Sequence, residues 1–417
     1  MSKHPIDLNN KSILVTGSPG FIGANLVMRL LREMSSGTIV SLDNMNDYYD
    51  VSLKEWRLAQ IEKTAQQVQK NLAAEQPQRD SAGDHAGKSV RHIFVRGSIA
   101  DKALVDSLFE KYRFDIVVNL AAQAGVRYSI DHPDVYIESN LIGFYNILEA
   151  CRHSYDHHSA GSAAGAKNSP CNDGGNVSAS DQDLASDSAG TYRGVQHLVY
   201  ASSSSVYGGN KKVPFSTEDK VDNPVSLYAA TKKSNELLAH AYSKLYNIPS
   251  TGLRFFTVYG PAGRPDMFYY SATKKLAAGE KIQIFNYGDM KRDFTYIDDI
   301  VEGILRVMQG APEKKNGEDG LPIPPYAVYN IGGGQPENLL DYIATLQEEL
   351  VRAGVLPADY DFEGHRELVG MQPGDVPVTY ADSEALEKDY GFTPQIGIRE
   401  GLRQFAEWYR EYYSHGI

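Results

Sequence analysis

The chain has 417 residues, of which 42% are apolar and 23% are charged, a composition typical of soluble globular proteins. This length predicts two or three domains, or one large and one small domain, and it is sufficient for a full hydrophobic core. The formal net charge of −12 argues against a general nucleic-acid-binding protein and against a protein that binds an anionic membrane surface.

Cysteine content and apolar runs predict the compartment. The two cysteines, Cys151 and Cys171, provide no disulfide framework and are typical of a reducing environment. No apolar run precedes the first expected strand, and no later stretch has the apolar length of a membrane span. We therefore expect a cytoplasmic protein with neither a membrane nor a nucleic acid as partner.

Six short apolar runs alternate with helical patterns in the first part of the chain. They are rich in Val, Ile, Leu and Phe and do not alternate with polar residues, which is typical of strands buried on both faces. The runs occupy residues 12–17, 38–43, 92–97, 115–121, 195–201 and 250–256. This pattern predicts an α/β fold with a doubly wound parallel sheet of the Rossmann type over residues 1–257.

Residues 258–417 break this rhythm and predict a smaller α+β lobe that binds the substrate. Helical patterns lie near 268–279, 297–309, 337–351 and 397–413. The segments around 297–310 and 326–334 are candidates to return to the main sheet, so the boundary between the two domains is soft.

Two segments are interpreted as inserts, residues 64–90 and 154–193. Both are poor in apolar residues, so they cannot offset their ordering entropy and we expect mobile surface loops. Histidines at 153, 157 and 158 lie near Cys171, but this spacing matches no common zinc pattern and we expect no metal.

A glycine-rich turn follows the first predicted strand. Gly17, Gly20 and Gly23 have the G-x-x-G-x-x-G spacing that lets backbone N–H groups approach a pyrophosphate at a helix N-terminus. Asp43 ends the second predicted strand, twenty residues after Gly23. A carboxylate there accepts hydrogen bonds from the adenosine ribose and repels the extra phosphate of NADP. The predicted cofactor is therefore NAD.

A second group of residues predicts acid–base chemistry. Tyr228 and Lys232 are four residues apart, so they lie on one face of a predicted helix. A lysine cation and a positively charged nicotinamide would favour the tyrosine anion and bring the pKa of Tyr228 toward neutral pH. Ser203 lies in the serine run that ends the preceding strand and can bind the same substrate oxygen.

Taken together, the motifs resemble those of the extended short-chain dehydrogenase/reductases, and within them the NAD-dependent nucleotide-sugar epimerases. They are "TGSPGFIG", "NLAAQAGVRYS", "ASSSSVYG", "YAATKK", "RFFTVYGPAGRPDM" and "GDMKRDFTYIDDIVEGI". They occur in family order over nearly the whole chain except the two inserts. The resemblance implies reversible C4 epimerisation of a UDP-hexuronate, UDP-glucuronate to UDP-galacturonate, through transient hydride transfer to tightly bound NAD.

The resemblance also assigns residues. It makes Ser203, Tyr228 and Lys232 catalytic, with Tyr228 and Lys232 also in contact with NAD. Further residues implied around NAD are Phe21, Ile22, Asn44, Ser98, Ile99, Leu120, Ala121, Ala122, Gln123 and Asn140. For the UDP-sugar, it implies a phosphate contact from Arg292, a pocket residue in Arg264, and carboxylate contacts from Ser204, Ser205 and Thr257. It further implies a homodimer through helices near 133–151 and 226–245.

Two departures from the family pattern concern the adenine contact and the sugar pocket. The family usually has an acid where this chain has Ser98, and a tryptophan where it has Ala262. Three alternatives stay open: epimerisation of another UDP-hexose such as UDP-glucose or UDP-N-acetylglucosamine, a dehydrogenase that releases NADH, and a non-catalytic NAD-binding regulator.

Overall fold

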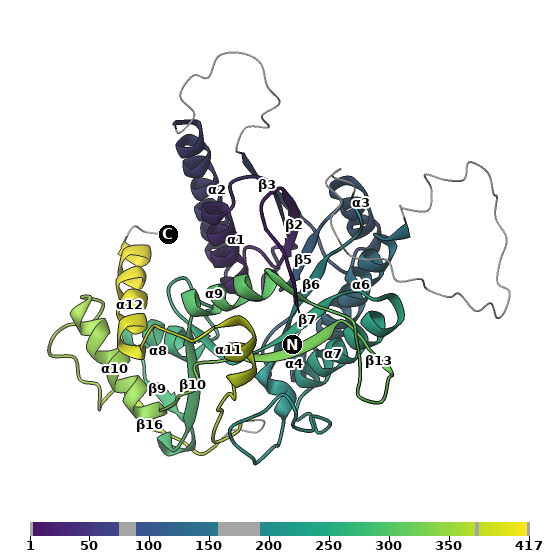
Figure 1. The fold of residues 1–417 in the computed structure, drawn as a ribbon. Coiled ribbons are helices and arrows are strands. Elements are labelled where there is room, and N and C mark those ends of the chain that lie inside the picture. Colours follow the sequence, from purple (N-terminus) through teal and green to yellow (C-terminus); the bar gives the residue numbers. More distant parts are fainter. Residues whose placement is uncertain (1–2, 75–88, 157–191, 372–374, 415–417) are drawn as a thin grey trace, which may run out of the picture.

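The computed structural model describes residues 3–74, 89–156, 192–371 and 375–414. Within these ranges, seven strands form one sheet in which every neighbouring pair is parallel. In sheet order they are β14 (Tyr326–Ile331), β7 (Ser250–Phe255), β6 (His197–Ser203), β5 (Ile116–Asn119), β2 (Lys11–Thr16), β3 (Gly37–Asp43) and β4 (Val90–Arg96). The predicted doubly wound α/β fold is confirmed (Figure 1).

Helices cover both faces of the sheet because successive strand residues point to opposite sides. Ile13 and Val15 pack in the layer of α1, α2 and α9, whereas Leu14 packs in the layer of α3, α6 and α7. The helices are α1 (Phe21–Glu33), α2 (Val51–Ala74), α9 (Ile297–Met308), α3 (Lys102–Tyr112), α6 (Gly143–His153) and α7 (Leu227–Tyr246). The short α4 (Tyr128–Asp131), α5 (Pro133–Tyr136) and η1 (Ile137–Ile142) lead into α6.

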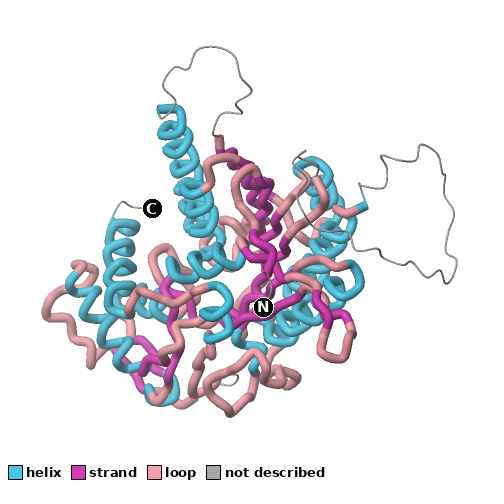
Figure 2. Tube along the Cα trace, in the orientation of Figure 1, coloured by secondary structure: helices cyan, strands magenta, loops and turns pink. Residues whose placement is uncertain are grey.

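The C-terminal lobe lies beside the carboxyl ends of the sheet strands and combines small sheets with helices (Figure 2). Its three-stranded sheet contains β8 (Thr257–Tyr259), β10 (Lys291–Tyr296) and β15 (Pro336–Asn338). A strand pair joins β9 (Ile282–Ile284) to β16 (Arg366–Leu368). The helices of this part are α8 (Phe268–Ala277), α10 (Leu339–Arg352), α11 (Glu384–Tyr390) and α12 (Ile398–Ser414), with a short helical turn η4 (Phe285–Gly288).

The chain crosses between the two parts more than once. The strand β14, from the C-terminal half, pairs with β7, and α9 packs on the main sheet. Two small pairs lie outside both sheets, β1 (Lys3–Pro5) with β11 (Gly310–Pro312) and β12 (Lys315–Asn316) with β13 (Pro322–Ile323). None of the helices in the described ranges combines the length and apolar content needed to cross a bilayer.

The first predicted insert is partly wrong. Residues 64–74 continue α2 to Ala74 instead of forming a loop, because this stretch is rich in Ala and Gln and extends an already packed helix. Residues 75–88 and, from the second insert, 157–191 lie outside the described residues. At the edge of the second insert, the Ser154 hydroxyl accepts from the backbone N–H of Val195 at 3.0 Å, which ties the end of α6 to the start of β6.

Candidate functional site

A cavity of about 950 Å³ opens at the carboxyl ends of the sheet strands, where the main sheet meets the C-terminal lobe. This is the edge at which doubly wound sheets bind ligands, next to the point where strand order reverses between β2 and β5. All predicted site residues except Asn140 line it. They are Gly17, Gly20, Phe21, Ile22, Gly23, Asp43, Asn44, Ser98, Ile99, Leu120, Ala121, Ala122, Gln123, Ser203, Ser204, Ser205, Tyr228, Lys232, Thr257, Arg264 and Arg292.

The turn from β2 into α1 fits a pyrophosphate group. Gly17 has φ +71°, and a Cβ there would lie 2.8 Å from the backbone nitrogen of Ala121. A Cβ on Gly23 would lie 2.3 Å from the carbonyl oxygen of Gly17. No side chain caps the N-terminus of α1 at Gly20, and its first turn carries no acid. The first N–H groups of α1 are therefore available to an anion in a cradle that side chains would fill.

Asp43 stands at the end of β3 beside a buried cation. Its Oδ1 accepts from the backbone N–H of Met45 at 2.7 Å and lies 3.9 Å from Nζ of Lys54. Burial raises the pKa of Asp43, while the charges of Lys54 and Arg57 oppose this shift. Lys54 donates to both Oδ1 and the carbonyl oxygen of Asn46, at 2.6 and 2.8 Å. The acid expected to select NAD thus has a positive neighbour that the sequence argument did not include.

Asn140 lies behind the lining of the cavity. In η1, its side chain accepts from the backbone N–H of Gln123 at 2.8 Å and donates to the Gln123 carbonyl at 3.0 Å. Asn235 of α7 donates to the Asn140 carbonyl at 2.7 Å. Asn140 therefore fixes the segment of Gln123, which does line the cavity. Asn140 itself does not line the cavity, so its predicted contact with the cofactor would be indirect.

The predicted catalytic hydroxyls come from two adjacent elements. Ser203 ends β6, and Tyr228 lies in the first turn of α7, whose N-cap Ser226 accepts from Ala229 N–H. The Ser203 hydroxyl lies 3.1 Å from that of Ser205 and accepts from its backbone N–H, which starts the short helix η3 (Ser204–Tyr207). The serine run is therefore a strand end followed by a capped helical turn that exposes hydroxyls to the cavity.

The pKa of Tyr228 differs from the prediction. Burial raises the pKa of Tyr228, and the groups that oppose this shift are the Ser203 hydroxyl and the Arg264 cation rather than Lys232. Lys232 is itself buried, which lowers its pKa to about 8. Its ammonium donates to the carbonyl oxygen of Ala201 at 2.8 Å. The expected lowering by Lys232 is thus wrong for the protein alone, because desolvation outweighs a cation that is bonded elsewhere.

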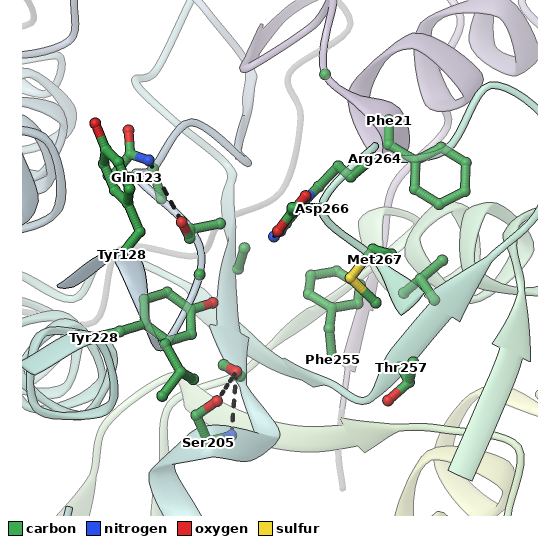
Figure 3. Close-up of a pocket in the computed structure, with 18 of the residues that line it drawn as sticks. Phe21, Gln123, Tyr128, Ser205, Tyr228, Phe255, Thr257, Arg264, Asp266 and Met267 are labelled. Atoms are coloured by element: carbon green, nitrogen blue, oxygen red, sulfur yellow. Dashed lines mark hydrogen bonds and ion pairs between the residues drawn. The ribbon is translucent and has the colours of Figure 1, made fainter. Parts of the chain in front are cut away.

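An arginine and an acid face Tyr228 across the cavity. Arg264 forms a two-bond pair with Asp266, at 2.9 and 2.5 Å, and Tyr48 donates to the same carboxylate at 3.1 Å. Arg264 holds the pKa of Asp266 below its usual range. Figure 3 shows Tyr228 on one side of the cavity, the Arg264–Asp266 pair opposite it, and Thr257 at the start of β8. This part of the cavity is therefore lined by hydroxyls and by the oriented Arg264 cation.

Arg292 lines the part of the cavity that the C-terminal lobe forms. Its Nη1 donates to the carbonyl oxygens of Lys291 and Pro377, at 3.0 and 3.1 Å. Burial lowers the pKa of Arg292, and the nearby Asp375 carboxylate opposes this shift. Asp375 also pairs with Arg127 at 3.2 Å, so charged groups from both lobes meet at this end of the cavity.

The family model described as "NAD dependent epimerase/dehydratase family" matches residues 13–332. The chain belongs to this NAD dependent epimerase/dehydratase family. The predicted family and the predicted cofactor, NAD, are confirmed.

Relatives of known name cover nearly the whole chain. It is 36% identical over 407 residues to the probable UDP-glucuronate 4-epimerase of Rhizobium meliloti strain 1021, covering 96% of this chain and 97% of that one. It is 37% identical over 414 residues to UDP-glucuronate 4-epimerase 2 of Arabidopsis thaliana, covering 98% of this chain and 78% of the relative. A crystal structure of UDP-glucuronic acid 4-epimerase from Bacillus cereus, in complex with UDP-glucuronic acid and NAD, has a TM-score of 0.69 and 26% identity, covering 96% of this chain and 100% of that chain.

Several residues of this family member's cavity were missed by the sequence argument. They include Tyr48, Lys54, Arg127, Tyr128 and Asp266. Lys54 had a usable signal, since a lysine in a helix that directly follows the NAD-selecting acid can reach back to it. The contact between Tyr48 and Asp266 carried no such signal, because it depends on how a loop after β3 packs against a loop 218 residues later.

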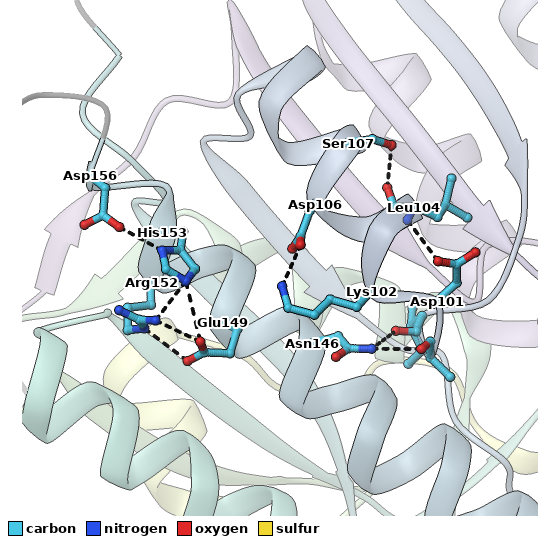
Figure 4. A network of polar contacts seen from close by, with 12 residues as sticks. Asp101, Lys102, Leu104, Asp106, Ser107, Asn146, Glu149, Arg152, His153 and Asp156 are labelled. Carbon is cyan, nitrogen blue, oxygen red and sulfur yellow. Dashed lines mark hydrogen bonds and ion pairs between the residues drawn. The ribbon is translucent and has the colours of Figure 1, made fainter. Parts of the chain in front are cut away.

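His153, considered as part of a metal site in the sequence, takes part in a network of ion pairs instead. At the end of α6 its Nδ1 lies 2.8 Å from Asp156, and its Nε2 lies 3.6 Å from Glu149 (Figure 4). Arg152 forms two bonds with Glu149, at 2.8 and 3.0 Å, and lowers the pKa of that acid to about 2. Within the described ranges no group of three or more His, Cys, Asp or Glu side chains is arranged to hold a metal ion.

Proposed function

We propose that this member of the family interconverts UDP-glucuronate and UDP-galacturonate at C4 with NAD as its tightly held cofactor. The observation that carries the proposal is that one cavity brings together Tyr228, the Arg264 guanidinium opposite it, and the hydroxyls of Thr257 and Ser205. An arginine and hydroxyl groups are the donors that a sugar carboxylate requires. The whole-length relatives that carry this name support the same substrate.

NAD, when bound, supplies a hydride acceptor that oxidises C4 to a ketone and then returns the hydride to either face of the sugar. The Tyr228 hydroxyl is the proposed acid–base group, because it lies in the first turn of α7 with its ring facing the cavity. In its neutral state, favoured by burial, it donates a proton to the ketone oxygen. In the oxidation of C4 the Tyr228 anion accepts the proton of the C4 hydroxyl, and Ser203 and Arg264 are the groups that stabilise this anion.

Ser203 and Lys232 have supporting roles in this proposal. The Ser203 hydroxyl, beside Tyr228, donates to the oxygen on C4 and holds it in line with the tyrosine. Lys232 is bonded to Ala201, so its first task is to hold α7 against β6, and its remaining N–H groups are available to the nicotinamide ribose.

The acids near the site argue for epimerisation over elimination of water. Glu236 bonds to Ser202 at 2.7 Å, but it is 2% exposed, pairs with Arg254 and does not line the cavity. Asp266 lines the cavity, but Arg264 lowers its pKa, so it stays ionised and cannot deliver a proton to a leaving hydroxyl. Among the described residues beside Ser203, no protonated acid is thus available for a second chemical step.

Arg292 is the proposed contact for the UDP diphosphate. Its guanidinium is well suited to bidentate phosphate binding. Firm binding of UDP at this end of the cavity lets the sugar at the other end rotate and present its opposite face without leaving the site.

The proposal is tested by incubating the purified protein with UDP-glucuronate, UDP-glucose and UDP-N-acetylglucosamine, and identifying products by NMR. UDP-galacturonate from the first substrate, with no net NADH, is expected. Turnover confined to the neutral sugars, accumulation of NADH, or bound NAD without turnover of any substrate would each support one of the alternatives and overturn the proposal.

We further propose a cytoplasmic homodimer that pairs through α6 and α7. Large apolar side chains stand exposed on these two helices, at Tyr145, Leu237 and Leu245, with exposed fractions of 43%, 60% and 68%. Exposed apolar side chains gathered on neighbouring helices are typical of subunit interfaces, and a two-fold axis would bury both copies of this face. Light scattering of wild type and Leu237→Glu should give a dimer and a monomer, respectively. A monomeric wild type would refute the pairing.

A further inference from the structure

Arg57 of α2 is a buried side chain that does not line the cavity. It is 1% exposed, and all five of its N–H donors are satisfied. Nε and Nη2 donate to the carbonyl oxygen of Ala262, at 2.9 and 2.7 Å, and Nη2 also donates to that of Gly263 at 2.8 Å. Nη1 donates to the carbonyl oxygen of Pro19 at 3.1 Å and to the Tyr49 hydroxyl at 2.7 Å. Each acceptor is a neutral oxygen, so a buried cation is held entirely by neutral hydrogen-bond acceptors.

These acceptors belong to segments with different tasks. Pro19 lies inside the glycine-rich turn, between Gly17 and Gly20. Ala262 and Gly263 directly precede Arg264, which lines the cavity. One guanidinium therefore joins the cofactor turn to the segment that presents the substrate-facing arginine.

The backbone of Ala262, which accepts two of the Arg57 hydrogen bonds, is held in an unusual conformation. Ala262 has φ +51°, a left-handed conformation that alanine disfavours, and it is 6% exposed. Strain of this kind persists only where the surroundings impose it. Two of the five Arg57 bonds end on the carbonyl oxygen of this residue, two positions before Arg264.

We propose that Arg57 is a positioning residue that couples the cofactor turn to Arg264. An anion bound at the N-terminus of α1 orders Pro19, and Arg57 transmits that order to residues 260–266. NAD binding then prepares the sugar side of the cavity by restricting where the Arg264 guanidinium can lie. Arg57→Lys keeps the positive charge but removes the planar guanidinium that bonds to both segments. It therefore separates the effect of the charge from the effect of the shared hydrogen bonds.

The first test is hydrogen exchange of the full-length protein with and without NAD. In wild type, NAD is expected to slow exchange in residues 17–23 and, with them, in residues 260–266. In Arg57→Lys, NAD should slow exchange in residues 17–23 only. Equal slowing of residues 260–266 in both proteins overturns the proposal, and so does a wild type in which NAD leaves that segment unchanged.

The control is Trp56→Leu, one residue earlier in α2. The Trp56 ring packs on Trp408 and Tyr412 of α12, at centroid distances of 5.9 and 5.6 Å, away from the cavity. This change weakens the packing of α2 but leaves the Arg57 bonds in place. If it abolishes the coupling as Arg57→Lys does, general loosening of α2 explains the effect and the proposal fails.

The second test measures ligand affinity, and it rests on the proposed function. With NAD present, Arg57→Lys should weaken binding of UDP-glucuronate about tenfold, as expected for a misplaced charged hydrogen-bond donor, and change binding of UDP less than about twofold. Equal weakening of both ligands would overturn the specific link to Arg264. A wild type that binds UDP but not UDP-glucuronate would refute the proposed substrate instead, and the exchange test would still decide the role of Arg57.

Discussion

The ammonium of Lys232 donates to the carbonyl oxygen of Ala201 at 2.8 Å, two residues before Ser203. Because Lys232 lies one turn after Tyr228 in α7, this bond holds the helix of the tyrosine against the strand of the serine. The hydroxyls of Tyr228 and Ser203, which we propose to be catalytic, are thereby positioned by a contact that does not involve either of them.

Replacing Tyr228 with Phe should abolish most turnover and leave the fold and NAD binding nearly intact. The change removes the acid–base hydroxyl but keeps the ring and the bond from Lys232 to Ala201. Loss of a positioned acid–base group typically costs about 10² to 10⁴ in rate. The epimerisation rate is measured by NMR, and NAD content is measured in the purified protein.

The matched control is Tyr242→Phe on the same helix. Its hydroxyl donates to Glu149 at 2.6 Å, outside the cavity, so turnover should change little. If Tyr228→Phe keeps most of the wild-type rate, Tyr228 is not the acid–base group.

Replacing Asp43 with Ala should weaken NAD binding about ten- to a hundredfold, the loss expected for hydrogen bonds to a charged group. NADP should lose much less affinity, because the acid no longer repels its phosphate and Lys54 remains beside the vacated position. Titrations with both cofactors measure the ratio. Adding Lys54→Met should remove this advantage of NADP over NAD. Equal losses for NAD and NADP would contradict the assignment of Asp43 as the selecting acid.

The order of elements and part of the cavity lining could be predicted because they depend on local sequence. Continuous apolar runs identify strands buried on both faces, and the carboxyl ends of parallel strands must meet at one edge. Gly17, Asp43 and Ser203 each follow or end such a strand, so their convergence needed no knowledge of tertiary packing.

The remaining features depend on packing between distant segments. The bonds of Arg57 to Ala262 and of Tyr48 to Asp266 span 205 and 218 residues, and no periodicity reports them. The pKa of Tyr228 in the protein alone depends on such packing too. Spacing indicated that Lys232 was near, but it could not show that burial and the carbonyl of Ala201 would dominate.

The buried Lys232 should make stability depend on pH in a defined direction. Its pKa is lowered from 10.5 to about 8 in the folded protein. Between these two values the unfolded chain holds a proton that the folded chain has lost, so the free energy of unfolding rises with pH. Relative to Lys232→Met, the NAD-free wild type should gain on the order of 1–3 kcal/mol between pH 8 and 10.5. Urea unfolding at both pH values measures this, and a constant difference between the two proteins would contradict a lowered pKa of Lys232.

The Glu236–Arg254 ion pair should dominate the stability of the sheet behind the site. Both side chains are at most 3% exposed, and their closest atoms lie 2.8 Å apart. Glu236→Gln leaves a buried arginine without its counter-charge, which costs about 3–5 kcal/mol in chemical unfolding. Glu302→Gln is the control, because its partners Arg29 and Arg306 are part-exposed, and it should cost less than about 1 kcal/mol. Similar losses in both variants would show that the buried pair has no special role.

Thr257 should protect the proposed reaction from a side product. Oxidation of UDP-glucuronate at C4 gives a β-keto acid, which loses carbon dioxide most readily when its carboxylate is free to turn perpendicular to the ketone. The Thr257 hydroxyl, at the start of β8 and lining the cavity, can hold that carboxylate by a hydrogen bond. Thr257→Ala should therefore raise the fraction of UDP-pentose among the products, whereas Thr257→Ser, which keeps the hydroxyl, should not.

Deuterium at C4 of the substrate shows whether both products share one oxidised intermediate. Because the hydride does not leave the cavity, wild type and both variants should retain the label in UDP-galacturonate, and Thr257→Ala should retain it in any UDP-pentose as well. NMR of the product mixture gives the ratio of the products and the retention of the label together. A wild type that forms mostly UDP-pentose, or that loses the label to solvent, would show that the cavity does not restrain the carboxylate or the hydride as proposed. An unchanged product ratio in Thr257→Ala would assign the restraint to Ser204, Ser205 and Arg264 alone.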